Sequence, residues 1–416
     1  MWRLNRKIRK EHMAKTGKYE FGKIIDRRNT SSLKYDFGPE RKGRDDLLPL
    51  WVADMDFRIP DEVIDELKGR LDHGIFGYTD PKPDYYEALV GWFQRQHGWE
   101  VKPEWNTVTP GVVYALATAV RAFTEKGDGV LIQQPVYYPF SEVIVDNHRR
   151  LVNNQLRYQE GTYSIDFVDF EQKIVENKVK LFLLCSPHNP VGRVWSREEL
   201  TRMGEICRQH QVIIVADEIH GDFVYAGHTH VPFASLSEEL ANQVVVCTSP
   251  SKTFNLAGLQ TANIIIPNEI LRRQFQHENA AAGYSQGNAL GLLACRLVYE
   301  KGEDWYRELL DYLAENLAFV RAFLKERIPE IKLVEPEGTY LIWLDCSGLT
   351  DSYKELEKLF VEEARLWVDA GKIFGRETAL FERINIACSR STLEQALLQL
   401  EGAIQNRRAN EQKADG

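Results

Sequence analysis

Apolar positions in the middle of the chain form short continuous runs, separated by stretches with helical periodicity. Such runs predict strands that are buried on both faces of a mainly parallel sheet. A helix is predicted over 196–210, where Ser196 and Glu199 form a capping-box pattern. The alternation of strands and helices is typical of an α/β domain. The predicted strands are 129–133, 180–185, 212–216, 243–247 and 261–266.

The C-terminal third shows a different pattern, which predicts a smaller α+β unit. Helices are expected over 304–327, 352–370 and 392–407, and strands over 332–334, 339–344 and 383–387. We therefore expect a large cofactor-binding domain over 61–300 and a small C-terminal domain over 301–416. Residues 19–60 are expected to pack on the small domain. The basic stretch 1–18 reads as a solvated, disordered extension.

Composition limits the classes of protein that this chain can represent. Of its 416 residues 44% are hydrophobic and 27% charged, the profile of a soluble globular enzyme. The net charge of −9 offers no attraction for nucleic acid or an anionic membrane, and we expect neither as a partner. No apolar run approaches the roughly 20 residues that span a bilayer. The basic N-terminus lacks the apolar core of a secretory signal, and an organelle-targeting peptide is the less favoured alternative.

The six cysteines lie far apart without any CxxC pair, mostly among apolar residues. They read as buried thiols rather than as a disulfide or zinc framework. We therefore expect a reducing, cytoplasmic compartment.

Polar or glycine-containing segments follow several of the predicted strands or open a predicted helix. They are 109–114, 186–192, 216–220 and 248–258. Because ligands bind at the carboxyl ends of parallel strands, these segments are expected to meet at one site. In the first segment Gly111 opens a helix, and backbone N–H groups at a helix N-terminus bind phosphate.

Lys252 stands out because it follows the apolar run 244–246. A lysine is costly beside buried apolar residues unless its charge is removed or used, and an imine with an aldehyde cofactor achieves this. Ser249 and Ser251 can donate hydrogen bonds to a phosphate on the same cofactor. An ordinary polar loop is the alternative interpretation of this segment on its own.

Asp217 ends a predicted buried strand, where an acidic side chain needs a partner such as a protonated ring nitrogen. A metal site with Glu218 and His220 is the alternative interpretation. It is disfavoured because no second group of histidines has ligand spacing. We therefore expect no metal.

Asn189 in the sequence HNPVG, Asp217 at a strand end and Lys252 in SPSK occur in an order and at separations that resemble the class I/II aminotransferases. These are fold-type I pyridoxal-phosphate enzymes, and the resemblance runs from about residue 19 to the last helix. It implies a mainly parallel sheet flanked by helices, together with a smaller α+β domain. Within that family the chain most resembles the cystathionine β-lyase branch, through the stretches 25–30, 50–57, 76–79, 217–220 and 383–388.

The resemblance implies roles for the matched residues. Lys252 would form the imine with pyridoxal phosphate and move the proton of the substrate Cα. Asp217 would pair with the pyridinium nitrogen, and Asn189 would bond the phenolic oxygen. Arg383 would clamp the carboxylate of an amino-acid substrate bidentately, with Arg390 as the alternative clamp. Ala53 would approach the substrate through its backbone, and Asn189 would also contact it.

The remaining implied positions surround the cofactor. Tyr137 would stack on its ring, with Tyr138 as the near alternative, and ordinary packing is the alternative for both Tyr137 and Tyr78. Trp51 is as consistent with the core as with the pocket wall. The phosphate would be held by Gly111, Val112, Val113, Ser249, Ser251 and the partner subunit's Tyr78, in a homodimer whose site is shared between subunits.

Two positions depart from the aminotransferase pattern and resemble the lyase branch. Gln260 stands where many aminotransferases carry a phosphate-binding arginine, and His220 stands where a tyrosine meets the cofactor oxygen. We therefore expect a carbon–sulfur β-lyase that cleaves cystathionine or related S-substituted cysteines to a thiol, pyruvate and ammonia. Lys252 and Tyr137 are both candidates to protonate the departing thiolate. An aminotransferase is the alternative, and a non-catalytic protein is disfavoured because Lys252, Asp217 and Asn189 are all present.

Overall fold

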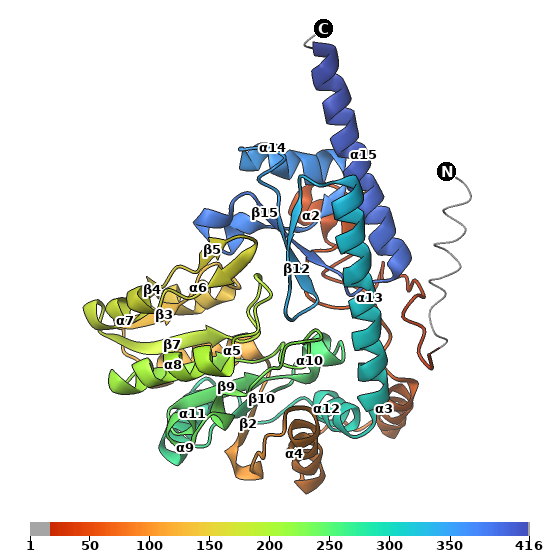
Figure 1. Ribbon diagram of the computed structural model, residues 1–416. Helices are drawn as coiled ribbons and strands as arrows, with labels where there is room; N and C mark the ends of the chain where they lie inside the picture. Colours follow the sequence, from red (N-terminus) through yellow and green to blue (C-terminus); the bar gives the residue numbers. More distant parts are fainter. Residues whose placement is uncertain (1–16, 415–416) are drawn as a thin grey trace.

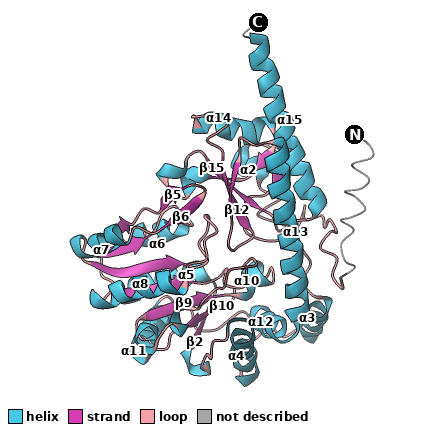
Figure 2. Ribbon diagram, viewed as in Figure 1, coloured by secondary structure: helices cyan, strands magenta, loops and turns pink. Residues whose placement is uncertain are grey.

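The computed structural model describes residues 17–414, and its larger unit is built on a seven-stranded sheet (Figures 1 and 2). Only β10 runs antiparallel to its neighbours; the other six strands share one direction. In spatial order the strands are β2 (Asn106–Thr109), β10 (Ala262–Ile265), β9 (Val244–Thr248), β8 (Ile213–Asp217), β7 (Val179–Cys185), β3 (Gly129–Ile132) and β4 (Arg150–Asn153).

Both faces of this sheet are covered, which explains the continuous apolar runs. Along β9, Val244 and Val246 belong to one hydrophobic cluster, and Val245 and Cys247 belong to the other. The five predicted strands are confirmed within one residue at each end. The edge strands β2 and β4 were not predicted, because they are short and carry polar or exposed residues.

Helices cover both faces of the sheet and continue around its edge (Figure 2). Ser196 caps α8 as its sequence predicts: it accepts from Glu199 N at 3.1 Å, and the Glu199 carboxylate accepts from Ser196 N at 2.9 Å. The helices of this unit are α3 (Asp61–His73), α4 (Pro83–His97), α5 (Val112–Phe123), α6 (Pro139–Val145), α7 (Phe167–Glu176), α8 (Arg197–Gln209), α9 (Glu238–Ala241), α10 (Pro250–Thr253), α11 (Glu269–Ala281) and α12 (Ala289–Lys301).

The smaller unit contains a four-stranded antiparallel sheet beside two long helices (Figure 1). The helices are α13 (Glu303–Arg327) and α15 (Arg390–Ala414), and both cover and extend the predicted spans. In spatial order the strands are β11 (Lys332–Val334), β12 (Leu341–Asp345), β15 (Phe381–Asn385) and β14 (Asp369–Ala370). A separate hairpin is formed by β5 (Arg157–Gln159) and β6 (Thr162–Ser164).

The early part of the chain contacts this unit. After the short helix α2 (Gly38–Lys42), β1 (Leu48–Pro49) pairs in parallel with β13 (Leu366–Trp367). The division into domains at residues 61 and 301 remains a prediction. The predicted extension 1–18 lies outside the described residues except for its last two positions. Of these, Lys18 donates its backbone N–H to Glu308 at 3.0 Å.

The single helix predicted over 352–370 is wrong in its second half. Helix α14 covers only Tyr353–Lys358, a π-helical turn follows at Leu359–Glu363, and β13 and β14 complete the span. Arg365 takes a left-handed backbone conformation with φ 55°, which breaks the helix. Leu366 and Trp367 then gain hydrogen-bonding partners in β1, so a tertiary contact overrides the local periodicity.

Within residues 17–414, no helix is both long enough and apolar enough to cross a membrane.

The capping box yields a first prediction. Ser196→Ala removes the side-chain acceptor at the start of α8 and should lower the free energy of unfolding by about 1 kcal/mol. Urea denaturation followed by circular dichroism measures this. Ser164→Ala, at an exposed position of β6, is the matched control and should change the same quantity by less than about 0.5 kcal/mol. Equal effects of the two substitutions would contradict the role of the cap.

Candidate active site

A cavity lies at the carboxyl ends of the parallel strands. The loops after β2, β3, β7, β8 and β9 all reach it, as a doubly wound sheet requires. Arg383 and Tyr78 lie outside its lining. The predicted residues that line it are Ala53, Gly111, Val112, Val113, Tyr137, Asn189, Asp217, His220, Ser249, Ser251 and Lys252.

Lys252 lies on α10, the single helical turn that follows β9. Its Nζ donates a hydrogen bond to the carbonyl oxygen of Ala53 at 2.8 Å. Burial lowers the pKa of Lys252 to about 8, and the positive charge of Arg383 adds to the effect. A larger fraction of the amine is therefore neutral and nucleophilic near neutral pH, as imine formation with an aldehyde requires.

Asp217 ends β8 with its side chain buried and facing the same cavity. Its Oδ1 accepts from the backbone N–H of Ile219 at 3.1 Å. Burial raises the pKa of Asp217 to about 7, although the Lys252 charge opposes this. A cationic N–H donor in the cavity would compensate the carboxylate, so Asp217 fits a protonated ring nitrogen.

Arg383 reaches the edge of the cavity through Asn189. It is buried on β15 and donates to Asn189 Oδ1 and to Trp51 O, both at 2.9 Å, and it forms an ion pair with Asp369. Its Nε–H has no partner within the described chain. A buried donor without a partner is costly, so the Nε–H retains the capacity to donate one hydrogen bond.

The N-terminus of α5 forms the wall expected for the phosphate. Gly111, Val112 and Val113 line the cavity, and the space that a side chain on Gly111 would enter is open. The Ser251 hydroxyl makes no hydrogen bond within residues 17–414, so it is available to a ligand. The Ser249 hydroxyl instead donates to Thr261 O at 2.7 Å and accepts from Ser251 N at 3.0 Å. Its proton is not directed at the cavity, contrary to the expected phosphate contact.

His220 and Tyr137 complete the lining near Asn189. His220 is buried with Nδ1 unpartnered in the described chain, and burial together with the Lys252 charge holds its pKa well below the usual range. The ring is therefore neutral. Tyr137 donates its backbone N–H to Asn189 O at 3.0 Å, whereas Tyr138 does not line the cavity. Residues 17–414 hold no group of three or more His, Cys, Asp or Glu side chains arranged for a metal ion.

Three other candidates lie away from this cavity. Arg390 donates from Nε to Asn316 Oδ1 at 2.8 Å, which makes it a poor alternative to Arg383 as the carboxylate clamp. Trp51 stacks on Trp367 at 4.5 Å between ring centroids, beside the cavity rather than in it. Tyr78 is 97% exposed and contributes nothing to the site of its own chain.

Sequence reasoning missed the residues that hold the Ala53 loop. The Tyr340 hydroxyl donates to Ala53 O at 2.9 Å, so this carbonyl serves both Tyr340 and Lys252. Asn385 donates to Val52 O at 2.8 Å and to Asp54 O at 2.7 Å. An asparagine within the apolar stretch 384–387 was the available signal, because a buried amide needs partners.

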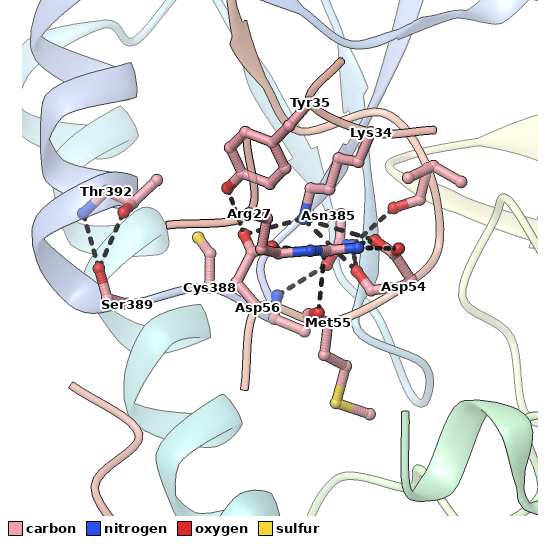
Figure 3. Close-up of polar contacts among 12 residues, drawn as sticks. Arg27, Lys34, Tyr35, Asp54, Met55, Asp56, Asn385, Cys388, Ser389 and Thr392 are labelled. Carbon is pink, nitrogen blue, oxygen red and sulfur yellow. Dashed lines mark hydrogen bonds and ion pairs between the residues drawn. The ribbon is translucent and has the colours of Figure 1, made fainter. Parts of the chain in front are cut away.

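Charged side chains of this loop pair with cations from the preceding part of the chain (Figure 3). Lys34 is fully buried, and its Nζ lies 2.9 Å from Asp56 Oδ2. Arg27 pairs with Asp54 at 2.6 Å and with Asp56 at 2.8 Å, and the Tyr35 hydroxyl donates to Asp56 at 2.9 Å. Two cations thus balance two carboxylates, as buried charges require.

Comparison with known proteins relates this geometry to a family. The pattern that defines "Aminotransferase class I and II" matches residues 45–400. Cystathionine beta-lyase PatB from Bacillus subtilis is 45% identical over 384 residues, which cover 92% of this chain and 99% of the relative.

Two solved structures share the fold. Cystalysin from Treponema denticola, which contains pyridoxal 5'-phosphate, superposes with a TM-score of 0.91 at 37% identity, covering 93% of this chain and 99% of that one. The PLP-bound C–S lyase from Staphylococcus hominis has a TM-score of 0.87 at 34% identity, covering 94% and 99%. The predicted fold class is confirmed.

The charge pairs of the Ala53 loop generate the second prediction. Lys34→Met keeps much of the side-chain volume but leaves Asp56 with one cation fewer, and should lower the free energy of unfolding by about 3–5 kcal/mol. The denaturant midpoint measures this. Lys23→Met, at an exposed lysine that pairs with Glu20 at 3.5 Å, is the control and should change it by less than about 0.5 kcal/mol. If Lys34→Met kept the wild-type denaturant midpoint, Lys34 would not be needed to compensate these carboxylates.

Proposed function

The chain belongs to the class I and II aminotransferase family, and we propose that it is a pyridoxal-phosphate-dependent carbon–sulfur β-lyase. Its substrates are cystathionine or related S-substituted cysteines, and its products are a thiol, pyruvate and ammonia. The observation that carries this function is the amine of Lys252, held in the cavity at 2.8 Å from Ala53 O with its pKa lowered to about 8.

Pyridoxal phosphate is the cofactor, and the donors of the cavity match its groups. Lys252 would take the aldehyde, Asp217 the ring nitrogen, and Asn189 with neutral His220 the phenolic oxygen. The α5 N-terminus and Ser251 would take the phosphate, and Tyr137 would lie against the ring. When bound, the cofactor stabilises the negative charge that remains at Cα after its proton leaves.

Lys252 then acts as the base. Arg383 binds the substrate carboxylate, because its buried guanidinium can offer the unpartnered Nε–H. The amine of Lys252 accepts the Cα proton. The electron pair from that C–H bond forms the Cα–Cβ double bond as the Cβ–S bond breaks, and the sulfur leaves as a thiolate. Lys252 or Tyr137 returns a proton to the sulfur, and the released enamine hydrolyses to pyruvate and ammonia.

The departing group has room beyond Lys252. A second chamber shares Ala53 and Lys252 with the cofactor cavity and is lined further out by Ile25, Leu33 and Phe57. Because Lys252 borders both spaces, we assign this chamber to the substituent on sulfur.

Elimination is favoured over amino transfer by two positions in the cavity. Gln260 lines it where many aminotransferases carry a phosphate-binding arginine, and His220 replaces a tyrosine. The site therefore lacks one cation and one phenol that support transamination in those enzymes. An aminotransferase remains the alternative function.

A homodimer completes the proposed site. The loop at 74–79 exposes Ile75, Phe76 and Tyr78 by 65%, 57% and 97%. Such a cluster of exposed apolar side chains favours a protein interface. The partner subunit's Tyr78 would then contact the phosphate. All six cysteines are free and buried, in keeping with a reducing cytoplasmic compartment.

The third prediction separates the two reactions. With L-cystathionine and no added oxo acid, the wild-type protein should release pyruvate. Lys252→Ala should lower the rate of pyruvate release at least about 10²-fold. It should also abolish the visible absorbance that arises when Lys252 forms its imine with the cofactor. Lys180→Ala, at an exposed lysine of β7, is the control and should match the wild type. Amino transfer to 2-oxoglutarate without pyruvate would instead establish the aminotransferase.

The fourth prediction tests the shared site. Tyr78→Ala and Lys252→Ala should each be inactive alone. After the two are unfolded together and refolded, activity should return to at most about a quarter of wild type, because half of randomly formed dimers are hybrids with one intact site. No recovery would place Tyr78 outside the partner's site.

A further inference from the structure

A second group of buried polar side chains lies directly behind the wall of the cofactor cavity. It contains His97, Glu218, Asp222 and His230, whose side chains are at most 11% exposed. They line a small cavity that shares Ile219 and Ser249 with the cofactor cavity. None of them reaches the cofactor cavity, so the proposed chemistry leaves all four unexplained.

Asp222 is the centre of this cluster. Its carboxylate accepts hydrogen bonds from His97 Nε2 at 2.9 Å, Trp92 Nε1 at 3.3 Å and Thr253 Oγ1 at 2.6 Å. Burial tends to raise the pKa of Asp222, but these donors outweigh it and leave the pKa below its usual value. The carboxylate is therefore ionised and acts only as an acceptor.

The Glu218–His230 pair packs against the Asp222–His97 pair. Glu218 accepts from His230 at 3.1 Å and from the backbone N–H of Phe233 at 2.7 Å. The rings of His97 and His230 meet edge to face, with centroids 5.4 Å apart. Gly221 makes room for this contact, because a Cβ there would lie 2.9 Å from the His230 ring.

The bond to Thr253 connects the cluster to the reacting lysine. Thr253 is fully buried, follows Lys252 directly and ends α10. A four-residue helix has no stability of its own, because nucleation costs more than one turn returns. Adjacent helical residues point about 100° apart, so a fixed Thr253 side chain determines the direction of the Lys252 side chain.

We propose that Asp222 is a positioning residue for Lys252: by holding the Thr253 hydroxyl it fixes the rotation of α10 and keeps Nζ at the Ala53 carbonyl. His97 and Trp92 orient the Asp222 carboxylate for this task. The Glu218–His230 pair supports His97 and also fixes the residue next to Asp217. The proposal rests on the role of Lys252 in the proposed function.

Thr253→Val in the holoenzyme tests this proposal, because it removes the hydroxyl and nearly preserves the volume. We expect the cofactor to be retained and KM to stay within about twofold. We expect kcat to fall about tenfold, the equivalent of losing one hydrogen bond to a charged acceptor. The visible absorbance that depends on Lys252 changes with pH, and the midpoint of this change should also shift from its wild-type value. Thr253→Ser, which keeps the donor, should restore both quantities.

Thr248→Val is the matched control. This buried threonine ends β9 and lines the same small cavity, but its Oγ1 donates to Asn263 O at 2.9 Å and not to Asp222. Its kcat and absorbance midpoint should stay at wild-type values. If Thr253→Val does not fold, Asp222→Asn, which keeps an acceptor but loses the charge, is measured in the same way.

The proposal would be overturned if Thr253→Val kept the wild-type kcat and the wild-type midpoint of the absorbance change. It would also be overturned if Thr248→Val lost as much kcat as Thr253→Val. A wild-type protein without any Lys252-dependent absorbance would instead refute the proposed function.

Discussion

The carbonyl oxygen of Ala53 accepts hydrogen bonds from both Lys252 Nζ and the Tyr340 hydroxyl, at 2.8 and 2.9 Å. An amine in a buried site must lose its charge or keep a partner, and this carbonyl is the partner that Lys252 has. The location of the carbonyl therefore sets the location of the amine. Residues from three distant parts of the sequence meet at this point, so the reactive geometry exists only in the assembled chain.

The Ala53 loop needs support because it has little regular structure of its own. Asn385 holds it from β15 and Asn255 holds it from the segment after α10, with bonds to Met55 in both directions. The ion pairs of Arg27 and Lys34 anchor its far end. Charges of this kind add little net stability compared with apolar packing, but they specify one arrangement strongly, since breaking a single pair leaves an uncompensated charge.

The fold could be predicted wherever local pattern and tertiary role agree. The central strands are buried on both faces, so their runs of valine and isoleucine are visible in the sequence. The edge strand β4 has one buried residue in four and shows no such run. The segment 359–370 has helical periodicity, but its secondary structure depends on pairing with β1, more than 300 residues earlier. No local pattern contains that information.

The residues of the candidate site also differ in how far the sequence predicts them. Residues expected to touch the cofactor follow strand ends, and that position together with the family resemblance marked Lys252, Asp217 and Asn189. Residues that act through others carry no such mark: Thr253 and Tyr340 look like ordinary members of a turn and a strand. Their importance depends on which atom their hydroxyl groups reach, and that follows from packing. In the proposed reaction Lys252 acts first as nucleophile and then as base, so that reaction depends on these supporting contacts as well as on the amine.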